Sequence, residues 1–234
     1  MAVYVTSDLH GFSLPKFKQL LKVIGFTYSD WLYIIGDVID RNNDGGVEML
    51  LWLLEQPNVE LLLGNHEHMM LACSWAFRKI TDEEIAGLST KKLDNLNVWM
   101  SNGAGPTIEA LKGILKTSPD TIEDILDYLN DAPICEGLEV NGKSFILCHG
   151  GFKNFDKNKK LSEYTKKEIL WNRPNIEDRY FDDVTTILGH TPTVLYSGKR
   201  KAFHTDTWID IDVGAGSGYP PMFLRLDDMK EFYF

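Results

Sequence analysis

The stretch Gly36-Asp37-Val38-Ile39-Asp40-Arg41 directly follows the apolar run Trp31-Leu32-Tyr33-Ile34-Ile35. An apolar, partly β-branched run that ends in Gly-Asp predicts a buried strand leading into a loop. This loop carries two carboxylates and a guanidinium at the carboxyl end of the strand, where open α/β sheets place their chemistry. Taken alone, the pattern is more often that of a helix cap or a turn, so its interpretation depends on the rest of the chain.

The same arrangement, an apolar strand followed by a short loop rich in Asp, Asn, His and Gly, recurs along the chain. The further loops are Ser7-Asp8-Leu9-His10-Gly11, Gly64-Asn65-His66-Glu67, His149-Gly150-Gly151 and Gly189-His190-Thr191-Pro192. Because parallel strands end at one edge of a sheet, we expect these loops to converge on a single site.

Strand and helix patterns alternate in the first part of the chain. We expect strands at 2–6, 31–35 and 59–63 and helices at 16–25 and 47–54. This order is the signature of a parallel sheet with right-handed crossovers. Residues 69–131 lose the strand pattern and predict a helical insertion, with helices at 107–115 and 121–130, that walls or covers the site.

The second half of the chain is rich in strand patterns. We expect strands at 134–140, 144–148, 184–188, 193–197, 208–213 and 222–226, with a short edge strand at 231–234. Asn141-Gly142 predicts a tight hairpin between the first two. Since the candidate site residues are spread from Asp8 to His190, residues 1–234 are expected to form a single domain.

Composition restricts the class of protein. The 234 residues are 44% hydrophobic and carry a formal net charge of -10, which argues against a surface that binds nucleic acid. The three cysteines lack paired spacing, so neither a disulfide framework nor a thiolate zinc site is expected. With no signal peptide or membrane span predicted, we expect a cytoplasmic protein without a membrane partner, and the oligomeric state stays open.

The loops together offer six nitrogen and oxygen ligands for metal ions. They are Asp8, His10, Asp37, Asn65, His149 and His190. A mixed set without thiolate suits Mn, Fe or Zn better than Ca or Mg, which prefer shells made of oxygen alone. The carboxylate of Asp37 has two oxygens and could therefore bridge two cations.

The five ordered motifs resemble the metallophosphoesterase, or calcineurin-like, superfamily. Asp40-Arg41 and Leu170-Trp171-Asn172-Arg173-Pro174 resemble its phosphoprotein phosphatase branch, especially the small bacterial and phage serine/threonine phosphatases. The resemblance covers Asp8 to about Gly214. It implies an α/β fold, the calcineurin-like metallophosphoesterase four-layer sandwich of two mixed β-sheets flanked by helices, with the insertion at 69–131 beside the active site.

The resemblance also implies two metal sites, most simply filled by two Mn²⁺ ions, with Fe or Zn as alternatives. Asp8, His10 and Asp37 would hold the first ion, and Asp37, Asn65, His149 and His190 the second. A hydroxide between the ions would attack phosphorus in line. Two family glycines are replaced, by Ser7 and by Asn42, so two backbone turns are expected to differ slightly.

The resemblance assigns the proton transfer and the phosphate contacts to four further residues. Arg41 and Arg173 would hold the phosphoryl oxygens through their planar guanidinium groups. His66 would protonate the leaving oxygen, and Asp40 would fix the tautomer of its imidazole.

The function expected first is that of a dinuclear, metal-dependent phosphomonoester hydrolase, a serine/threonine protein phosphatase whose partner is a phosphorylated protein or a small phosphoester. The alternative is a symmetrical diadenosine tetraphosphatase or another nucleotide phosphohydrolase, although that branch usually carries asparagine where this chain has Asp40. An alternative of another class is a non-catalytic metal-binding scaffold. Such relatives typically lose metal ligands or the acid histidine, and this chain has all of them.

Overall fold

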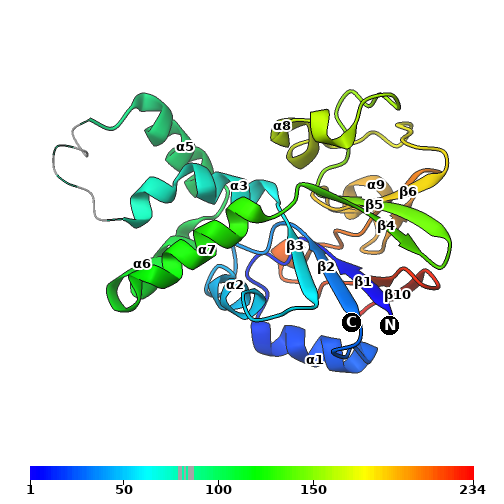
Figure 1. Cartoon of the computed structure of the whole chain (residues 1–234), viewed down its shortest axis with the longest axis horizontal. Helices are drawn as coiled ribbons and strands as arrows, with labels where there is room; N and C mark the ends of the chain where they lie inside the picture. The colour runs from blue at the N-terminus through cyan, green and yellow to red at the C-terminus, as the bar shows by residue number, and fades with distance from the viewer. Residues whose placement is uncertain (79–80, 82, 84–86) are drawn as a thin grey trace.

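The computed structural model describes residues 1–78, 81, 83 and 87–234, and its described strands form two sheets (Figure 1). The first sheet has the order β10-β9-β1-β2-β3, with β1 at Val3–Thr6, β2 at Trp31–Ile35, β3 at Val59–Leu62, β9 at Phe223–Arg225 and β10 at Lys230–Phe232. The second has the order β4-β5-β6-β8-β7, with β4 at Cys135–Val140, β5 at Lys143–Cys148, β6 at Val184–Leu188, β7 at Phe203–His204 and β8 at Trp208–Asp210.

Both sheets are mixed. In the first, β1 and β3 run parallel to β2, whereas at the other edge β9 pairs antiparallel with β1 and β10 pairs antiparallel with β9. In the second, β6 runs parallel to β5 and β8, and β4 and β7 are antiparallel edge strands. The parallel strands are the ones that precede the candidate site loops, so their carboxyl ends bring these loops together.

The alternation of side chains along the central strands explains why the first sheet packs against helices on one face and against the second sheet on the other. Successive side chains of a strand point to opposite faces. Tyr4, Ile34 and Leu61 therefore pack against helices α1 (Leu14–Ile24) and α2 (Val47–Leu53). Their neighbours Val5, Ile35 and Leu62 form a second core with side chains of the other sheet.

The outer face of the second sheet has its own core, in which Trp208 and Leu188 pack with Ile169 of α8 (Lys166–Leu170). Helices thus cover the outer faces of two sheets that pack face to face. This confirms the predicted four-layer α/β sandwich.

Most of residues 69–131 is helical, as predicted. The described elements are the end of α3 (Asn65–Ala72), the 3₁₀ turn η1 (Ser74–Phe77), α5 (Thr90–Ser101), α6 (Gly105–Thr117) and α7 (Pro119–Asp131). Figure 1 shows α5, α6 and α7 lying together on one side of the two sheets. Helices α6 and α7 match the two expected helices, and α5 is additional. Residues 79–80, 82 and 84–86 of the insertion lie outside the described residues.

The prediction that Gly64-Asn65-His66-Glu67 forms a loop is wrong. Asn65 and His66 form the first turn of α3 rather than a loop. Glu67, the third helical residue, accepts a hydrogen bond from the backbone N–H of Gly64, so the helix begins with the reciprocal contact of a capping box. The two site residues are therefore held by regular structure.

The strand predicted at 193–197 is also wrong, because the chain forms the short helix α9 (Val194–Ser197) there. Pro192 precedes this turn and Thr193 already has helical dihedral angles. Gly198, at φ 69°, ends the helix in the left-handed conformation. These flanking residues outweigh the preference of Val194 and Tyr196 for a strand.

The predicted hairpin is confirmed. Val140 pairs with Lys143, and Asn141 and Gly142 both have positive φ, at 51° and 74°, as a type I′ turn requires. The expected strand at 208–213 ends at Asp210, and 222–226 is strand only over Phe223–Arg225. Among the described helices, none combines the length and the apolar character needed to cross a membrane.

Candidate metal centre and active site

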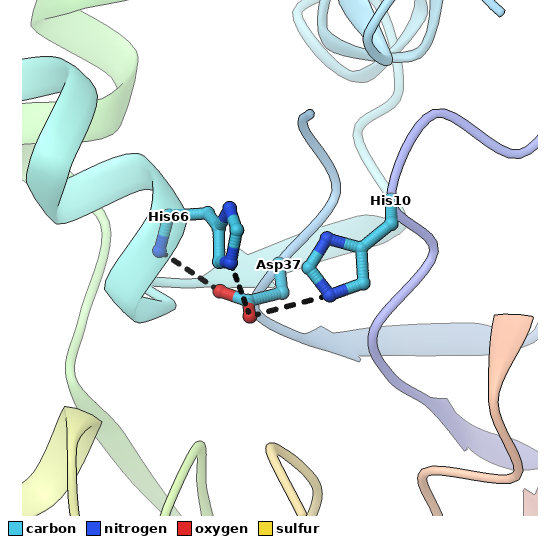
Figure 2. Close-up of side chains that lie close together, drawn as sticks. All are labelled: His10, Asp37 and His66. Carbon is cyan, nitrogen blue, oxygen red and sulfur yellow. Dashed lines mark hydrogen bonds and ion pairs between the residues drawn. The ribbon is translucent and has the colours of Figure 1, made fainter. Parts of the chain in front are cut away.

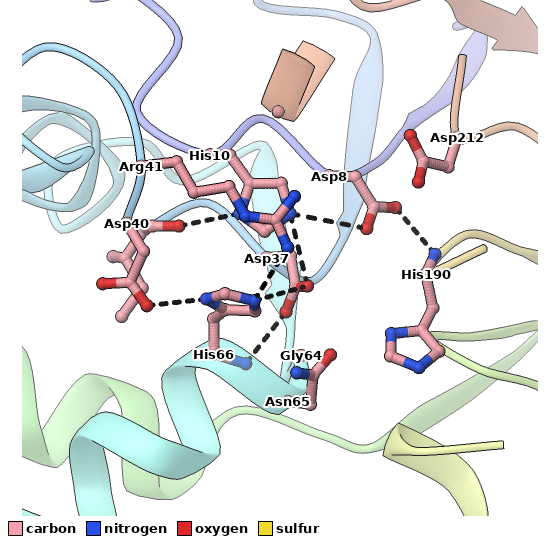
Figure 3. A network of polar contacts seen from close by, with 12 residues as sticks. Asp8, His10, Asp37, Asp40, Arg41, Gly64, Asn65, His66, His190 and Asp212 are labelled. Carbon is pink, nitrogen blue, oxygen red and sulfur yellow. Dashed lines mark hydrogen bonds and ion pairs between the residues drawn. The ribbon is translucent and has the colours of Figure 1, made fainter. Parts of the chain in front are cut away.

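The six predicted metal ligands all lie at the carboxyl ends of parallel strands. Asp8 and His10 follow β1, Asp37 follows β2, Asn65 follows β3, His149 follows β5 and His190 follows β6. All six are buried, and the most exposed of them, His190, is 7% exposed. Figure 3 draws Asp8, His10, Asp37, Asn65 and His190 close to one another. The convergence expected from the sequence therefore occurs, from both sheets.

Unusual backbone conformations aim these side chains. Asp8, His10, Asp37 and His190 have φ between 42° and 69°, the left-handed region that residues other than glycine rarely occupy. Such conformations cost free energy and persist where the surrounding structure enforces them, typically at functional sites. Gly36 contributes differently: a Cβ there would lie 2.5 Å from Cα of Gly64, so glycine lets the two loops touch.

Asp37 lies at the centre of the cluster (Figure 2). Its Oδ2 is 3.5 Å from Nε2 of His10 and 3.3 Å from Nε2 of His149. Its Oδ1 accepts a hydrogen bond of 3.0 Å from the backbone N–H of His66. Burial alone would raise the pKa of Asp37, but the surrounding histidines, His149 foremost, hold it well below its usual range. The carboxylate therefore stays ionised between two groups of imidazoles.

Hydrogen bonds to the main chain orient two of the imidazoles. Nδ1 of His10 lies 3.0 Å from the carbonyl oxygen of Ile39, and Nδ1 of His149 lies 2.9 Å from that of Ile35. A carbonyl can only accept, so Nδ1 carries the proton in each ring. Nε2 of each ring therefore faces Asp37, the orientation in which a histidine binds a metal once Nε2 has lost its proton.

The described residues contain two sets of ligand atoms close enough to share a cation. One set is His10, Asp37 and His66, and the other is Asp37, His149 and His190. Asn65 joins the second set, since its Oδ1 lies 2.9 Å from Nε2 of His149. The predicted ligand Asp8 lies slightly further out, with Oδ1 4.0 Å from Nε2 of His10. These atoms fit two divalent cations that share Asp37.

The chemistry of this ligand set is that of a hydrolytic metal centre. Two cations bound here would lower the pKa of a bound water and offset the charge of a phosphate group. Without cations, burial shifts the pKa values of these side chains. It raises the pKa of Asp8 to about 6, and together with the charge of His149 it lowers the pKa of His190 to about 2. Bound cations would stabilise this cluster, because they favour ionised carboxylates and neutral imidazoles.

His66 and Asp40 form a close pair next to this cluster. Nδ1 of His66 lies 2.6 Å from Oδ2 of Asp40, which leaves Nε2 pointing toward the metal ligands (Figure 3). Nη2 of Arg41 lies 3.2 Å from that Nε2. Burial would lower the pKa of His66, but the carboxylates of Asp37 and Asp40 outweigh burial and raise it. The arrangement suits a proton donor facing the site.

Both predicted phosphate-binding arginines line the cavity above the cluster, along with Trp171, Asn102 and Asp212. Nη1 of Arg173 donates to the carbonyl oxygen of His190 at 3.0 Å and to Oγ1 of Thr191 at 3.1 Å. These contacts fix one side of the guanidinium. Arg41 and Arg173 thus present two planar forks to one cavity, as binding of phosphoryl oxygens requires.

The sequence interpretation missed the part played by Glu67. Its buried carboxylate accepts hydrogen bonds from the backbone N–H groups of Asp37, Val38, Ile39 and Gly64 at 2.8 to 3.2 Å. It thereby fixes the loop that carries Asp37. A glutamate three residues after a helix start is a readable capping signal, although its reach to a second loop is not.

Asp212 was missed because it fell within an expected strand. The strand ends two residues earlier, and Asp212 lines the cavity near Asp8 (Figure 3). Burial, followed by the charge of Asp8, raises the pKa of Asp212 well above its usual value. Its Oδ1 accepts a hydrogen bond from the backbone N–H of Gly214.

The two expected departures from the family glycines are accommodated. Asn42 donates from Nδ2 to the carbonyl oxygen of His10 at 2.9 Å and so supports the loop of a metal ligand. Ser7 is buried, and its Oγ has no hydrogen-bond partner among the described residues.

Comparison with known proteins agrees with this geometry. The family model for calcineurin-like phosphoesterases matches residues 1–213. A symmetrical bis(5'-nucleosyl)-tetraphosphatase of Chromobacterium violaceum is 40% identical over 205 residues, which cover 82% of this chain and 57% of that protein. Two Acidovorax proteins of the same name are covered to 48%, so the chain spans about half the length of these curated relatives.

Solved structures share the fold. One, of a protein assigned provisionally as a diadenosine tetraphosphatase, has a TM-score of 0.64 at 14% identity, covering 99% of this chain and 91% of that one. Another, a protein serine/threonine phosphatase from Saccharomyces cerevisiae, has a TM-score of 0.53 at 15% identity, covering 90% of this chain and 66% of that one. At such identities the likeness shows the fold alone.

Proposed function

The chain belongs to the calcineurin-like phosphoesterase family of metal-dependent phosphoester hydrolases, and on this basis we propose that it cleaves a symmetrical dinucleoside tetraphosphate such as diadenosine tetraphosphate. The observation that carries the substrate is the 40% identity to a symmetrical bis(5'-nucleosyl)-tetraphosphatase over 82% of this chain. These relatives favour the dinucleotide tetraphosphatase, which the sequence motifs placed second, over the protein phosphatase. A phosphorylated protein is therefore the second candidate substrate.

The cavity is suited to a chain of phosphates. Arg41 and Arg173 both line it, as does Asp37, the shared ligand of the two cations we propose. With a central phosphoryl group bound next to Asp37, the two guanidinium groups can hold oxygens of the flanking phosphates. Cleavage at the centre of a tetraphosphate then yields two nucleoside diphosphates. We take Mn²⁺ as the native metal, with Fe or Zn as alternatives.

The roles we propose for the remaining residues follow from their contacts. Arg41 and Arg173 position the phosphate chain and offset its charge. His66 holds a proton on Nδ1 toward Asp40 and can deliver a second proton from Nε2 to the departing oxygen. Asp40 keeps the imidazole in that orientation and stabilises its charged form.

Phosphoserine or phosphothreonine in protein is the second candidate because of one specific contact. The hydrogen bond of 2.6 Å between Asp40 and His66 stabilises the protonated imidazole, so that a proton is available to the leaving oxygen. A serine alkoxide needs such a donor to leave, whereas a nucleoside diphosphate leaves more readily. The nucleotide-cleaving branch that the chain resembles usually has asparagine in place of Asp40.

A panel of two substrates tests the proposal. The purified protein is stripped with a chelator, reloaded with Mn²⁺, and offered diadenosine tetraphosphate or a phosphoserine peptide at equal concentration. We expect a higher kcat/KM for the dinucleotide, with ADP as the only nucleotide product. ATP with AMP as products, or preference for the peptide, would contradict the proposal, and the latter would establish the second candidate.

A further inference from the structure

The carboxylate of Asp40 is held by three hydrogen-bond donors from three different helices. Oδ2 accepts from Nδ1 of His66 in α3 at 2.6 Å and from Nε1 of Trp99 in α5 at 2.8 Å. Oδ1 accepts from Oγ1 of Thr107 in α6 at 2.6 Å. Two of the three donors therefore belong to the helical insertion and not to the strand-end loops.

This group is sealed from solvent. Asp40, Trp99 and Thr107 are each 0% exposed. The indole of Trp99 packs edge-on against Phe77, with ring centroids 6.0 Å apart. An ionised carboxylate is costly to bury unless its oxygens are hydrogen-bonded, and in such a dry site each donor counts for more than it would at the surface. The donors thus fix which way the carboxylate faces.

The insertion is also joined to the main chain on either side of Asp40. The backbone N–H of Asp40 donates to Oγ1 of Thr107 at 3.0 Å, so this hydroxyl contacts the residue twice. The backbone N–H of Arg41 donates to the carbonyl oxygen of Gly103 at 2.9 Å. A Cβ on Gly103 would lie 2.9 Å from Cγ of Arg41, so the turn between α5 and α6 requires glycine there.

We infer that Trp99 and Thr107 are positioning residues, which act through Asp40 to hold His66 where it can protonate the leaving oxygen. The inference rests on the phosphoester hydrolysis proposed above but not on which substrate is cleaved. It gives the insertion a part in proton transfer, in addition to the wall that Asn102 contributes to the cavity. Neither residue touches the substrate, so neither is catalytic.

The test removes one donor at a time with little change of shape. Trp99→Phe deletes the indole N–H, and Thr107→Val deletes the hydroxyl, whereas Thr107→Ser restores it. The chain offers matched controls, because Nε1 of Trp75 and Oγ1 of Thr186 are buried without a partner among the described residues. Trp75→Phe and Thr186→Val therefore make the same chemical change at sites where the described part of the chain shows no hydrogen bond to lose.

The assay compares two small esters that differ in leaving group, phenyl phosphate and 4-nitrophenyl phosphate, on the Mn²⁺-loaded full chain. We expect Trp99→Phe and Thr107→Val to lose roughly tenfold in kcat on phenyl phosphate, the lower end of effects seen for supporting hydrogen bonds. The loss on 4-nitrophenyl phosphate should be clearly smaller, because nitrophenolate leaves without a proton. KM and metal content should stay close to those of the unchanged protein, whereas the melting temperature should fall by a few degrees because each variant removes one donor from a buried carboxylate.

Coupling supplies a second criterion. In an Asp40→Asn background, Trp99→Phe should cost much less than it does alone, because both changes act on one proton transfer. The indole N–H resonance of Trp99, identified by its loss in Trp99→Phe, should move upfield in Asp40→Ala. Equal losses on both esters, additive losses with Asp40→Asn, an unmoved resonance, or the same loss in Trp75→Phe would each overturn the inference. A failure to cleave dinucleotides would leave this result unaffected.

Discussion

Oδ2 of Asp37 lies 3.3 Å from Nε2 of His149, and the two residues come from different sheets. This contact crosses from the end of β2 to the end of β5, so the candidate metal centre forms only when the two sheets pack. The set of ligands around Asp37, His149 and His190 therefore needs residues from both sheets.

Because Asp37 faces imidazoles on both sides, it should be the residue whose loss damages both metal sites. We predict that Asp37→Asn binds less than one equivalent of Mn²⁺ where the unchanged protein binds two. Elemental analysis after desalting measures this directly. The exposed Asp94→Asn serves as the control for the loss of one negative charge. Retention of both ions by Asp37→Asn would show that its carboxylate does not bridge them.

His66 lies close enough to Asp37 to be read as a ligand, since their Nε2 and Oδ2 atoms are 3.8 Å apart. We predict instead that His66→Asn keeps both metals and loses roughly 10²- to 10⁴-fold in kcat on phenyl phosphate, the usual range for one general acid. The loss on 4-nitrophenyl phosphate should be smaller. Loss of one metal equivalent would make His66 a ligand and refute its role as the acid.

Glu67 should matter for stability more than for chemistry. Glu67→Gln replaces one acceptor oxygen with an amide that cannot accept from the backbone N–H groups of the Asp37 loop. We expect the free energy of unfolding, measured in urea without metal, to fall by about 2–4 kcal/mol, since hydrogen bonds to a charged group are the stronger kind. Glu109→Gln, at an exposed position, should change it by no more than about 0.5 kcal/mol. Matching unfolding curves for the two variants would refute this role.

The buried carboxyl group of Asp210 should make the stability of the metal-free protein depend on pH. Burial, and then the neighbouring charge of Asp212, raises its pKa well above the usual value, and its Oδ2 has no partner among the described residues. The folded state then holds a proton that the unfolded chain releases near pH 4, so this contribution to stability is complete below about pH 4 and is lost as pH rises.

Asp210→Asn cannot ionise and should escape that loss. In chelator, we expect the variant and the unchanged protein to be about equally stable near pH 4. The variant should become the more stable one toward pH 8, by about 1.4 kcal/mol for each unit that separates the folded from the unfolded pKa. Urea unfolding at several pH values measures the difference. A difference that does not vary with pH would show that Asp210 does not titrate in this range.

The convergence of the strand-end loops was easier to predict from the sequence than the details of the fold around them. Asp8, Asp37 and His149 could be placed because each follows an apolar run whose end is visible in the sequence. Residues 193–197 were misplaced because Val194 and Tyr196 favour strands, whereas Pro192 and Gly198 impose a helical turn. Local propensity and flanking residues disagreed there, and the flanking residues decided the structure.

Other features depend on contacts between distant parts of the chain. Trp99 reaches Asp40 across 59 positions of sequence, and nothing in the pattern of α5 marks this tryptophan as different from any core aromatic. The left-handed backbone of His10 and His190 is likewise imposed by packing, since residues other than glycine rarely adopt it without support from the surrounding structure. Such features follow from the assembled sandwich and not from any one segment.

The most direct test of the account is a crystal structure of the full chain soaked with Mn²⁺, with the ions located by their anomalous scattering. We predict two peaks on either side of the Asp37 carboxylate, one beside His10 and Asp8, the other beside Asn65, His149 and His190. A single peak, or peaks that do not contact Asp37, would contradict it.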